Sequence, residues 1–255
     1  MNRTLKVAKA FSRAEESYNE HALVQNFAAQ RLATKILAQE GPTLGTLLEV
    51  GCGTGMLSRH LVSHAKHYVL TDFSFALLQK AHKQVRGGHV FPLVVDGEHP
   101  CFSASFDVIV SNLALHWFQD PKRALVRLVA CLKPGGRLYL TTLGNNTFHE
   151  WRTAHSLADA PCGILDFITF GQLKDWLPLS GIRTVEEEWV TTTPANALEF
   201  LRSLKAIGGR LPQPGHRPLP HKTFKKVMDT YNLNPKSSCQ ILYGTYQKPE
   251  KIREE

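Results

Sequence analysis

The sequence has no hydrophobic run long enough to cross a membrane and no cysteine pattern typical of a disulfide framework or a zinc site. No window of the 255 residues approaches the ~20 apolar residues of a transmembrane helix. Residues 1–10 carry three basic side chains without a following apolar core, so we expect no secretory signal. The five cysteines are odd in number, widely spaced and without a C-x-x-C pair. These absences favour a cytoplasmic protein.

Acidic residues are also in the minority, with 22 Asp and Glu against 30 Lys and Arg, a net charge of +8. Such a surplus is compatible with nucleic acid, anionic lipid or an acidic protein as partner, or simply with a basic protein in solution. His60, His64 and His67 fall near helical spacing, but no carboxylate or cysteine joins them, so we expect no metal. Charge alone does not choose a function.

What is present is an alternation of short apolar runs with amphipathic stretches, which predicts strands alternating with helices. The run at 106–111 is apolar on both faces, as in a central strand of a parallel sheet. The pattern predicts an α/β fold with a doubly wound, mostly parallel, seven-stranded sheet. Up to residue 142 we expect strands at 46–50, 68–71, 90–95, 106–111 and 138–142, and helices at 22–39, 55–64, 75–85 and 121–131.

The length favours a single domain over 1–255. Within it, residues 1–40 are expected to form an N-terminal helical lid, 145–180 a helical cap insertion, and 248–255 a charged, disordered tail. The prolines and glycines between Gly208 and Pro220 predict a flexible loop. The remaining expected elements are strands at 183–190 and 240–246 and helices at 194–207 and 221–230.

A glycine-rich turn follows the first expected strand, in the stretch Leu47 to Gly55 (LLEVGCGTG). Glycines admit positive φ and let a ligand approach the backbone closely. The dinucleotide fingerprint G-x-G-x-x-G is excluded because its last position is Met56. The pattern E-x-G-x-G-x-G instead resembles the first motif of class I S-adenosylmethionine-dependent methyltransferases, a Rossmann-like fold. Cys52 has no basic partner nearby, so we interpret it as a small side chain beside the cofactor rather than a nucleophile.

Polar residues end the next strands. Asp72 stands where a nucleoside-binding α/β fold supplies a carboxylate to the ribose hydroxyls, although it could also cap the following helix. Asp96 and Gly97 could receive the adenine amino group or form an ordinary turn. Asn112 and Leu113 follow the fourth strand at the switch point of the sheet, or are simply a polar strand end. The predicted cofactor-binding set is Glu49, Gly51, Cys52, Gly53, Gly55, Asp72, Phe73, Asp96, Gly97, Asn112 and Leu113.

Four further blocks of the sequence are Phe11 to Ala22 (FSRAEESYNEHA), Ser111 to Trp117 (SNLALHW), Thr141 to Leu143 (TTL) and Arg202 to Gly208 (RSLKAIG). Together they resemble one family, the malonyl-[acyl-carrier-protein] O-methyltransferases of biotin synthesis. With the C-terminal strand the similarity covers nearly the whole chain. Gly209 departs from the alanine frequent in the family, and the basic loop at 210–226 is less similar to it.

The resemblance implies methyl transfer from S-adenosyl-L-methionine to the free carboxyl of a malonyl thioester. That carboxyl, with a pKa near ~4, is already ionised at neutral pH, so no general base is expected. A cation should hold it, for which Arg202 is the candidate, with Lys205 on the same helical face. Tyr18 could close over the sulfonium with its ring, and His116 and Trp117 would line the pocket mouth. Each of these residues has a plainer alternative in a solvated helix face or in packing.

The implied partner is an acidic acyl-carrier protein carrying the malonyl group. Basic residues between positions 210 and 226 would suit its docking, although a basic patch with Phe224 could also indicate RNA binding. We find no recognisable RNA-binding module. Two alternatives stay open: another class I methyltransferase acting on a quinone precursor or RNA, and a non-catalytic adaptor of the same fold. The expected docking residues are Arg210, Arg217, Lys222, Lys225 and Lys226.

Overall fold

A computed structural model describes residues 23–206 and 212–250. These residues form two compact units, which are described separately. The first unit comprises 23–142, 169–187 and 242–250, and the second comprises 143–168, 188–206 and 212–241. The single domain predicted for 1–255, with its lid and cap, stays a prediction. Neither the lid's first 22 residues nor the last five residues of the predicted tail lie within the described part.

Seven strands form one mixed sheet in the described part of the chain, as the sequence predicts. The order across the sheet is β3-β2-β1-β4-β5-β7-β6. Successive strands are added on one side of β1 up to β3 and on its other side from β4 on, so the switch point of the sheet lies between β1 and β4. The strands are β1 (Thr46–Val50), β2 (His67–Asp72), β3 (Val90–Val94), β4 (Phe106–Ser111), β5 (Leu132–Leu143), β6 (Ile182–Thr192) and β7 (Ser237–Gln247).

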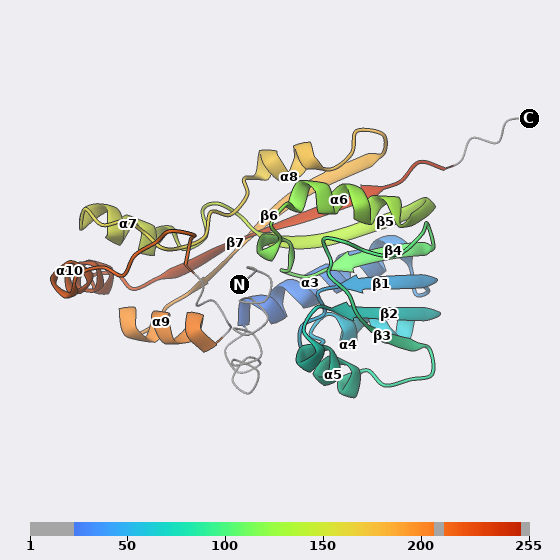
Figure 1. The fold of residues 1–255 in the computed structure, drawn as a ribbon, viewed down its shortest axis with the longest axis horizontal. Coiled ribbons are helices and arrows are strands. Elements are labelled where there is room, and N and C mark those ends of the chain that lie inside the picture. Colours follow the sequence, from blue (N-terminus) through green and yellow to red (C-terminus); the bar gives the residue numbers. More distant parts are fainter. Residues whose placement is uncertain (1–22, 207–211, 251–255) are drawn as a thin grey trace, which may run out of the picture. The chain divides into compact units, whose positions relative to one another are not determined.

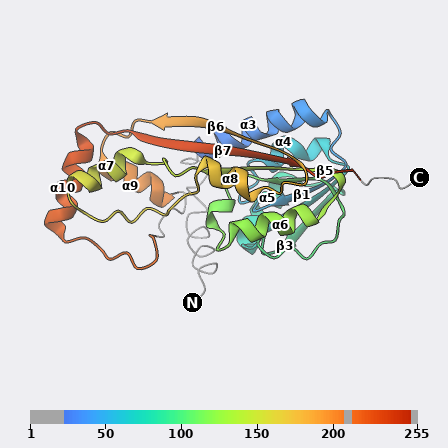
Figure 2. The ribbon, with the colours of Figure 1, turned by 90° about the horizontal axis from the view of Figure 1, so that it is seen from above.

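The first unit contains the parallel part of this sheet. β1 pairs in parallel with β2 on one side and β4 on the other, and β2–β3 and β4–β5 are parallel as well. Figure 2 shows α3 and α4 on one side of these strands and α6 on the other. Crossovers on both faces bury the central strands, which is why most residues of β1 and β4 are apolar. The helices of this unit are α3 (Leu23–Glu40), α4 (Ser58–Leu61), α5 (Phe75–Gln84), α6 (Pro121–Ala130) and α8 (Phe170–Trp176), with 3-10 turns at Val62–His64 and Leu115–Trp117.

Two expected elements have different bounds in the structure. The helix expected at 55–64 begins at Ser58, because the residues before it belong to the glycine turn. β5 begins at Leu132, six residues earlier than expected, so the Lys133–Gly136 segment lies within the strand rather than outside it. The pairing of β5 with β4 shifts there, and Gly135 has a φ of +77°. The glycine's freedom lets an irregular segment continue the strand.

The second unit contains a helical layer packed around aromatic side chains. Its helices are α7 (His149–Leu157), α9 (Ala197–Ala206) and α10 (His221–Asn232), which lie together in both views (Figures 1 and 2). The Trp151 ring packs within 5.3 Å of Phe200 and 5.2 Å of Tyr231, centroid to centroid. Of the two helices expected in the 145–180 cap, α7 belongs to this unit and α8 to the other. None of the helices in the described ranges is long and apolar enough to span a membrane.

Candidate cofactor site

The glycine turn lies at the carboxyl end of β1, at the switch point of the sheet. Gly51, Gly53 and Gly55 all have positive φ, at 69°, 55° and 87°. At Gly51 a Cβ would lie 2.7 Å from the Cβ of Ala114, so a larger residue would not fit. The turn therefore requires glycine for both its backbone conformation and its close packing. The backbone of the turn lies at the carboxyl ends of the parallel strands, where open α/β sheets bind their ligands.

Asp72 ends β2 next to this turn. The residue is 5% exposed, and its carboxylate accepts the Gly53 N–H (2.9 Å) and the Ser74 N–H (2.8 Å). The cap of α5 is Ser74, whose hydroxyl accepts the Leu77 N–H, so Asp72 is not that cap. Burial raises the pKa of Asp72 to about 6, and the two backbone hydrogen bonds oppose the shift. The group is thus largely ionised at neutral pH, with lone pairs left for donors such as ribose hydroxyls.

Glu49 lies beneath the turn and is only 1% exposed. Its Oε2 accepts hydrogen bonds from the Ser58 hydroxyl (2.5 Å) and the Tyr68 hydroxyl (2.7 Å). Burial raises the pKa of Glu49 to about 7, against the effect of these two hydrogen bonds. The acid therefore ties β1, β2 and the start of α4 together under the glycines. Its predicted contact with the cofactor stays a prediction.

The switch point continues at Asn112 and Leu113, after β4. Leu113 has a φ of 49°, an uncommon conformation for a leucine, and is buried. Thr141 holds this turn: its Oγ1 accepts the Leu113 N–H (2.9 Å) and donates to the Asn112 side-chain oxygen (2.8 Å). The Asn112 amide nitrogen in turn donates to the Gln25 carbonyl on α3. The Asn112 side chain is thus engaged by protein groups, which leaves the strained backbone of this turn as the part suited to a ligand.

Asp96 and Gly97 form a local turn after β3. The Asp96 carboxylate accepts the Glu98 N–H (3.0 Å) and lies 3.2 Å from Nδ1 of His99. A Cβ at Gly97 would lie 2.5 Å from Val50 Cγ1, at the end of β1. Gly97 therefore brings its backbone close to the glycine turn, whereas the Asp96 carboxylate serves the turn itself. An adenine contact at this position stays a prediction.

Two titratable side chains near the glycine turn and the Asn112–Leu113 turn, those of Cys52 and His116, are uncharged at neutral pH. Burial raises the pKa of the Cys52 thiol well above its usual value, with Asp72 adding to the shift, so the thiol stays protonated. Burial also lowers the pKa of His116 to about 3, so this imidazole is uncharged at neutral pH. Phe73 is partly exposed beside Asp72. In the described ranges no three His, Cys, Asp or Glu side chains are grouped so that they could hold a metal ion.

The residues predicted to bind the substrate lie elsewhere in the chain. Arg202 and Lys205 are exposed on α9, in the second unit, whereas the predicted cofactor residues all belong to the first. Tyr18 and Arg210 fall outside the described residues. His116 and Trp117 form a 3-10 turn directly after the Asn112–Leu113 turn.

Sequence reasoning missed Thr141 as a member of the site. The residue stood in the TTL block, but its distance of 28 positions from Leu113 concealed the hydrogen bond. A threonine pair at the end of an apolar strand is the local pattern that could have suggested a buried hydroxyl with a specific partner.

The site has the features that S-adenosylmethionine requires. Gly51 and Gly53 of the turn are partly exposed, so a ligand's amino-acid end can approach the backbone there, and the ionised Asp72 stands where the ribose hydroxyls would donate hydrogen bonds. These two groups lie within hydrogen-bond distance of each other through the Gly53 N–H. The residues present therefore fit the group.

Comparison with known proteins identifies the family to which the chain belongs. A family model described as a methyltransferase domain matches residues 20–187. A malonyl-[acyl-carrier protein] O-methyltransferase of Magnetococcus marinus is 34% identical over 254 residues, covering 97% of this chain and 94% of the relative. The biotin biosynthesis bifunctional protein BioCD of Bordetella avium is 33% identical, covering 96% of this chain and 53% of that protein.

Among solved structures, the N-methyltransferase NodS from Bradyrhizobium japonicum, in complex with S-adenosyl-L-homocysteine, aligns with a TM-score of 0.54. The identity is 16%, and the alignment covers 87% of this chain and 86% of that chain, so this likeness concerns the fold. Fold, glycine turn and sequence relationship thus agree, and the co-substrate is S-adenosylmethionine. The chain belongs to the malonyl-[acyl-carrier protein] O-methyltransferase family of S-adenosylmethionine-dependent methyltransferases.

Proposed function

We propose that the protein methylates the free carboxylate of a malonyl group carried as a thioester on acyl-carrier protein, giving the methyl ester that primes pimeloyl synthesis for biotin. The observation that supports this most directly is the 34% identity, over nearly the whole of both chains, to a relative of that name. The glycine turn with the buried Asp72 supports the methyl donor. The names of the relatives favour this substrate over a quinone precursor, RNA or a non-catalytic role.

The proposed methyl transfer does not require general acid–base catalysis. S-adenosylmethionine supplies an electrophilic methyl group on a positively charged sulfur. A malonyl carboxyl with a pKa near ~4 is ionised at neutral pH, so no residue has to remove a proton. Neither neighbouring group is suited to remove a proton, because the Cys52 thiol stays protonated and the low pKa of His116 makes its imidazole a weak base. The protein's contribution is then to align the two reactants and to exclude water.

A carboxylate held in such a site needs a cation, and His116 does not supply one because burial keeps its imidazole neutral. Arg202 is the proposed cation, since a planar guanidinium binds a carboxylate with two parallel hydrogen bonds. Lys205 stands on the same exposed face of α9, three residues further on. Tyr18 is the proposed aromatic neighbour of the sulfonium.

The test is to incubate the protein with methyl-labelled S-adenosylmethionine and, separately, malonyl-carrier protein, malonyl-coenzyme A, succinyl-carrier protein and bulk tRNA. We expect base-labile label on the malonyl thioester. Arg202→Ala should lower kcat/KM at least ~10-fold, because one charge-assisted pair is lost, and Arg202→Lys should recover part of it. Label on tRNA, or none on any acceptor although S-adenosylmethionine binds, would refute the proposed substrate.

A further inference from the structure

A shallow groove follows the exposed face of α10, in the second unit. It has a volume of about 350 Å³, and three of the residues that line it are lysines. Each lining residue has another lining residue three or four positions away, so they share one face of the helix. We call this surface the α10 groove; it is lined by Lys222, Lys225, Lys226, Asp229, Thr230 and Leu233.

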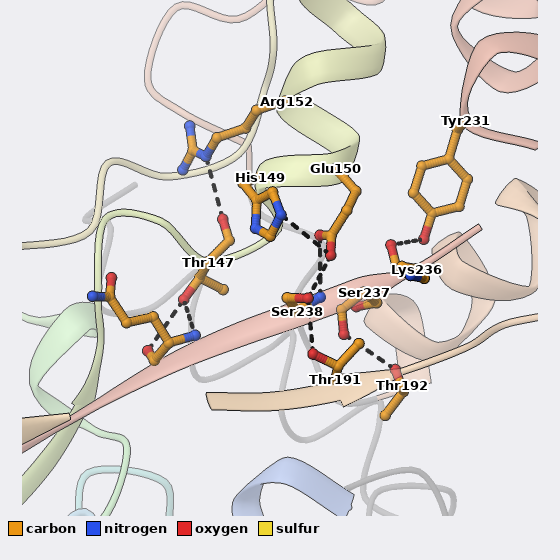
Figure 3. A network of polar contacts seen from close by, with 11 residues as sticks. Thr147, His149, Glu150, Arg152, Thr191, Thr192, Tyr231, Lys236, Ser237 and Ser238 are labelled. Carbon is orange, nitrogen blue, oxygen red and sulfur yellow. Dashed lines mark hydrogen bonds and ion pairs between the residues drawn. The ribbon is translucent and has the colours of Figure 1, made fainter. Parts of the chain in front are cut away.

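The opposite face of α10 is fixed to the second unit. Val227 is fully buried and Tyr231 is 2% exposed. The Tyr231 ring lies edge-on to Trp151 of α7, and its hydroxyl donates to the Lys236 carbonyl at 2.6 Å (Figure 3). Glu150 of α7 accepts the Ser238 N–H at the start of β7, which Figure 3 also shows. The α10 groove is therefore carried by a well-anchored helix.

The charges of the α10 groove are not balanced. Lys225 forms an ion pair with Asp229 at 2.8 Å. Lys222 and Lys226 form no ion pair with any of the described residues, although they stand four positions apart on the same face. Like charges at this spacing weaken a helix slightly, so the fold gains nothing from placing them there. An anionic partner would remove this repulsion.

The α10 groove also has an apolar residue at one end. Leu233 directly follows α10 and is 85% exposed. Specific protein interfaces combine an apolar contact with a surrounding rim of charged groups. Single-stranded RNA is usually held by stacking its bases on aromatic side chains, and no aromatic residue lines the groove. The combination fits an acidic protein surface better than RNA.

We propose that the α10 groove is the docking surface for the acidic acyl-carrier protein, with Lys222 and Lys226 meeting its carboxylates and Leu233 an apolar contact. This proposal rests on the proposed function, because it assigns a place to that function's partner. Charge complementarity of this kind acts mainly on encounter and orientation. It therefore affects the KM for a carrier-linked substrate and leaves the chemical step unchanged.

The test compares two pairs of charge reversals. Lys222→Glu with Lys226→Glu changes the α10 groove, whereas Lys83→Glu with Lys122→Glu makes the same change of charge at exposed positions of α5 and α6. Methylation is measured with malonyl-carrier protein and with malonyl-pantetheine, which lacks the carrier. We expect the α10 pair alone to raise KM for the carrier substrate about 10-fold or more at low salt, with malonyl-pantetheine unaffected. High salt should reduce the difference.

The outcomes separate the two proposals. If both pairs raise KM equally, overall charge is responsible and the α10 groove is not the docking surface. If neither pair does, the carrier binds elsewhere. If the α10 pair weakens tRNA binding but not carrier methylation, the surface belongs to RNA. If the wild-type protein methylates neither thioester while binding S-adenosylmethionine, the proposed function itself fails.

Discussion

Glu49 and Asp72 are both buried at the glycine turn, but different atoms surround their carboxylates. Hydroxyls of Ser58 and Tyr68 engage Glu49, whereas backbone N–H groups of Gly53 and Ser74 engage Asp72. Because the two hydroxyls come from α4 and β2, Glu49 connects these elements to β1 and has a structural role. Sequence reasoning predicted both acids as cofactor residues and could not distinguish them. The distinction depends on Tyr68, which meets Glu49 only when β1 and β2 pair.

Glu49 should make stability fall as pH rises. Its pKa is about 7 in the folded protein and 4.5 in its ordinary environment. Between these values the folded state binds more protons than the unfolded state, so the free energy of unfolding decreases from about pH 4.5 to pH 7 and then levels off. Glu49→Gln removes this titrating group. The decrease in the free energy of unfolding between about pH 4.5 and pH 7 should then be smaller by up to about 3 kcal/mol, at about 1.4 kcal/mol per pKa unit.

Urea unfolding from pH 4.5 to pH 8 measures this effect. Glu186→Gln serves as the control, because that carboxylate is exposed and pairs with Lys35 on the surface. An unchanged pH dependence in Glu49→Gln would show that Glu49 is not a buried, partly protonated acid.

At the scale of elements, hydrophobic patterning predicted most strands of the first unit because strands buried on both faces are short, apolar and interrupted by glycine or polar residues. The early start of β5 was not predictable in this way. Lys133 and the proline and glycines after it are typical of a turn, but Lys133 binds the Asp107 carboxylate of β4 at 2.8 Å. Backbone hydrogen bonds hold the segment as well, since the Gly135 N–H donates to the Lys248 carbonyl (3.1 Å) and the Lys248 N–H donates to the Gly136 carbonyl (2.9 Å). These partners are more than 100 positions away, so a local pattern does not reveal them.

Thr141 joins β5 to the turn after β4, and we expect it to position that turn. Thr141→Val removes the hydroxyl that donates to the Asn112 side-chain oxygen and leaves the Leu113 N–H only its 3.1 Å contact with the Thr141 carbonyl. Loss of a partner by a buried polar group costs about 1–3 kcal/mol. Because the turn borders the cofactor site, KM for S-adenosylmethionine should rise more than kcat falls. Thr141→Ser keeps the hydroxyl and should restore KM.

Thr142→Val is the matched control for this prediction. The neighbouring hydroxyl is buried as well, but it has no hydrogen-bond partner within 23–206 and 212–250. Its replacement should leave stability and KM nearly unchanged. Steady-state kinetics and thermal unfolding of the three variants test whether the Thr141 hydroxyl positions the turn. Equal effects of the two Thr→Val substitutions would show that Thr141 has a packing role only.

At the scale of the whole molecule, the predicted site residues are divided between two compact units. The cofactor residues belong to one unit, and Arg202, Lys205 and the α10 groove belong to the other. The first group was predicted from local patterns, since a glycine turn and strand ends follow one another in the chain, and its contact with the cofactor stays a prediction. The division of the chain into two units is not visible in any local sequence pattern. It depends on contacts between residues such as Trp151 and Tyr231, which are 80 positions apart.

The measurement that tests the central claim most directly is calorimetric titration of the protein with S-adenosylmethionine, with Asp72→Asn beside the wild type. We predict one bound molecule per chain. The variant should bind about 10- to 100-fold more weakly, because a hydrogen bond to a charged group contributes about 1.5–3 kcal/mol. Equal binding by the two proteins would exclude Asp72 from the site. No binding by the folded wild-type protein would contradict its assignment as a methyltransferase.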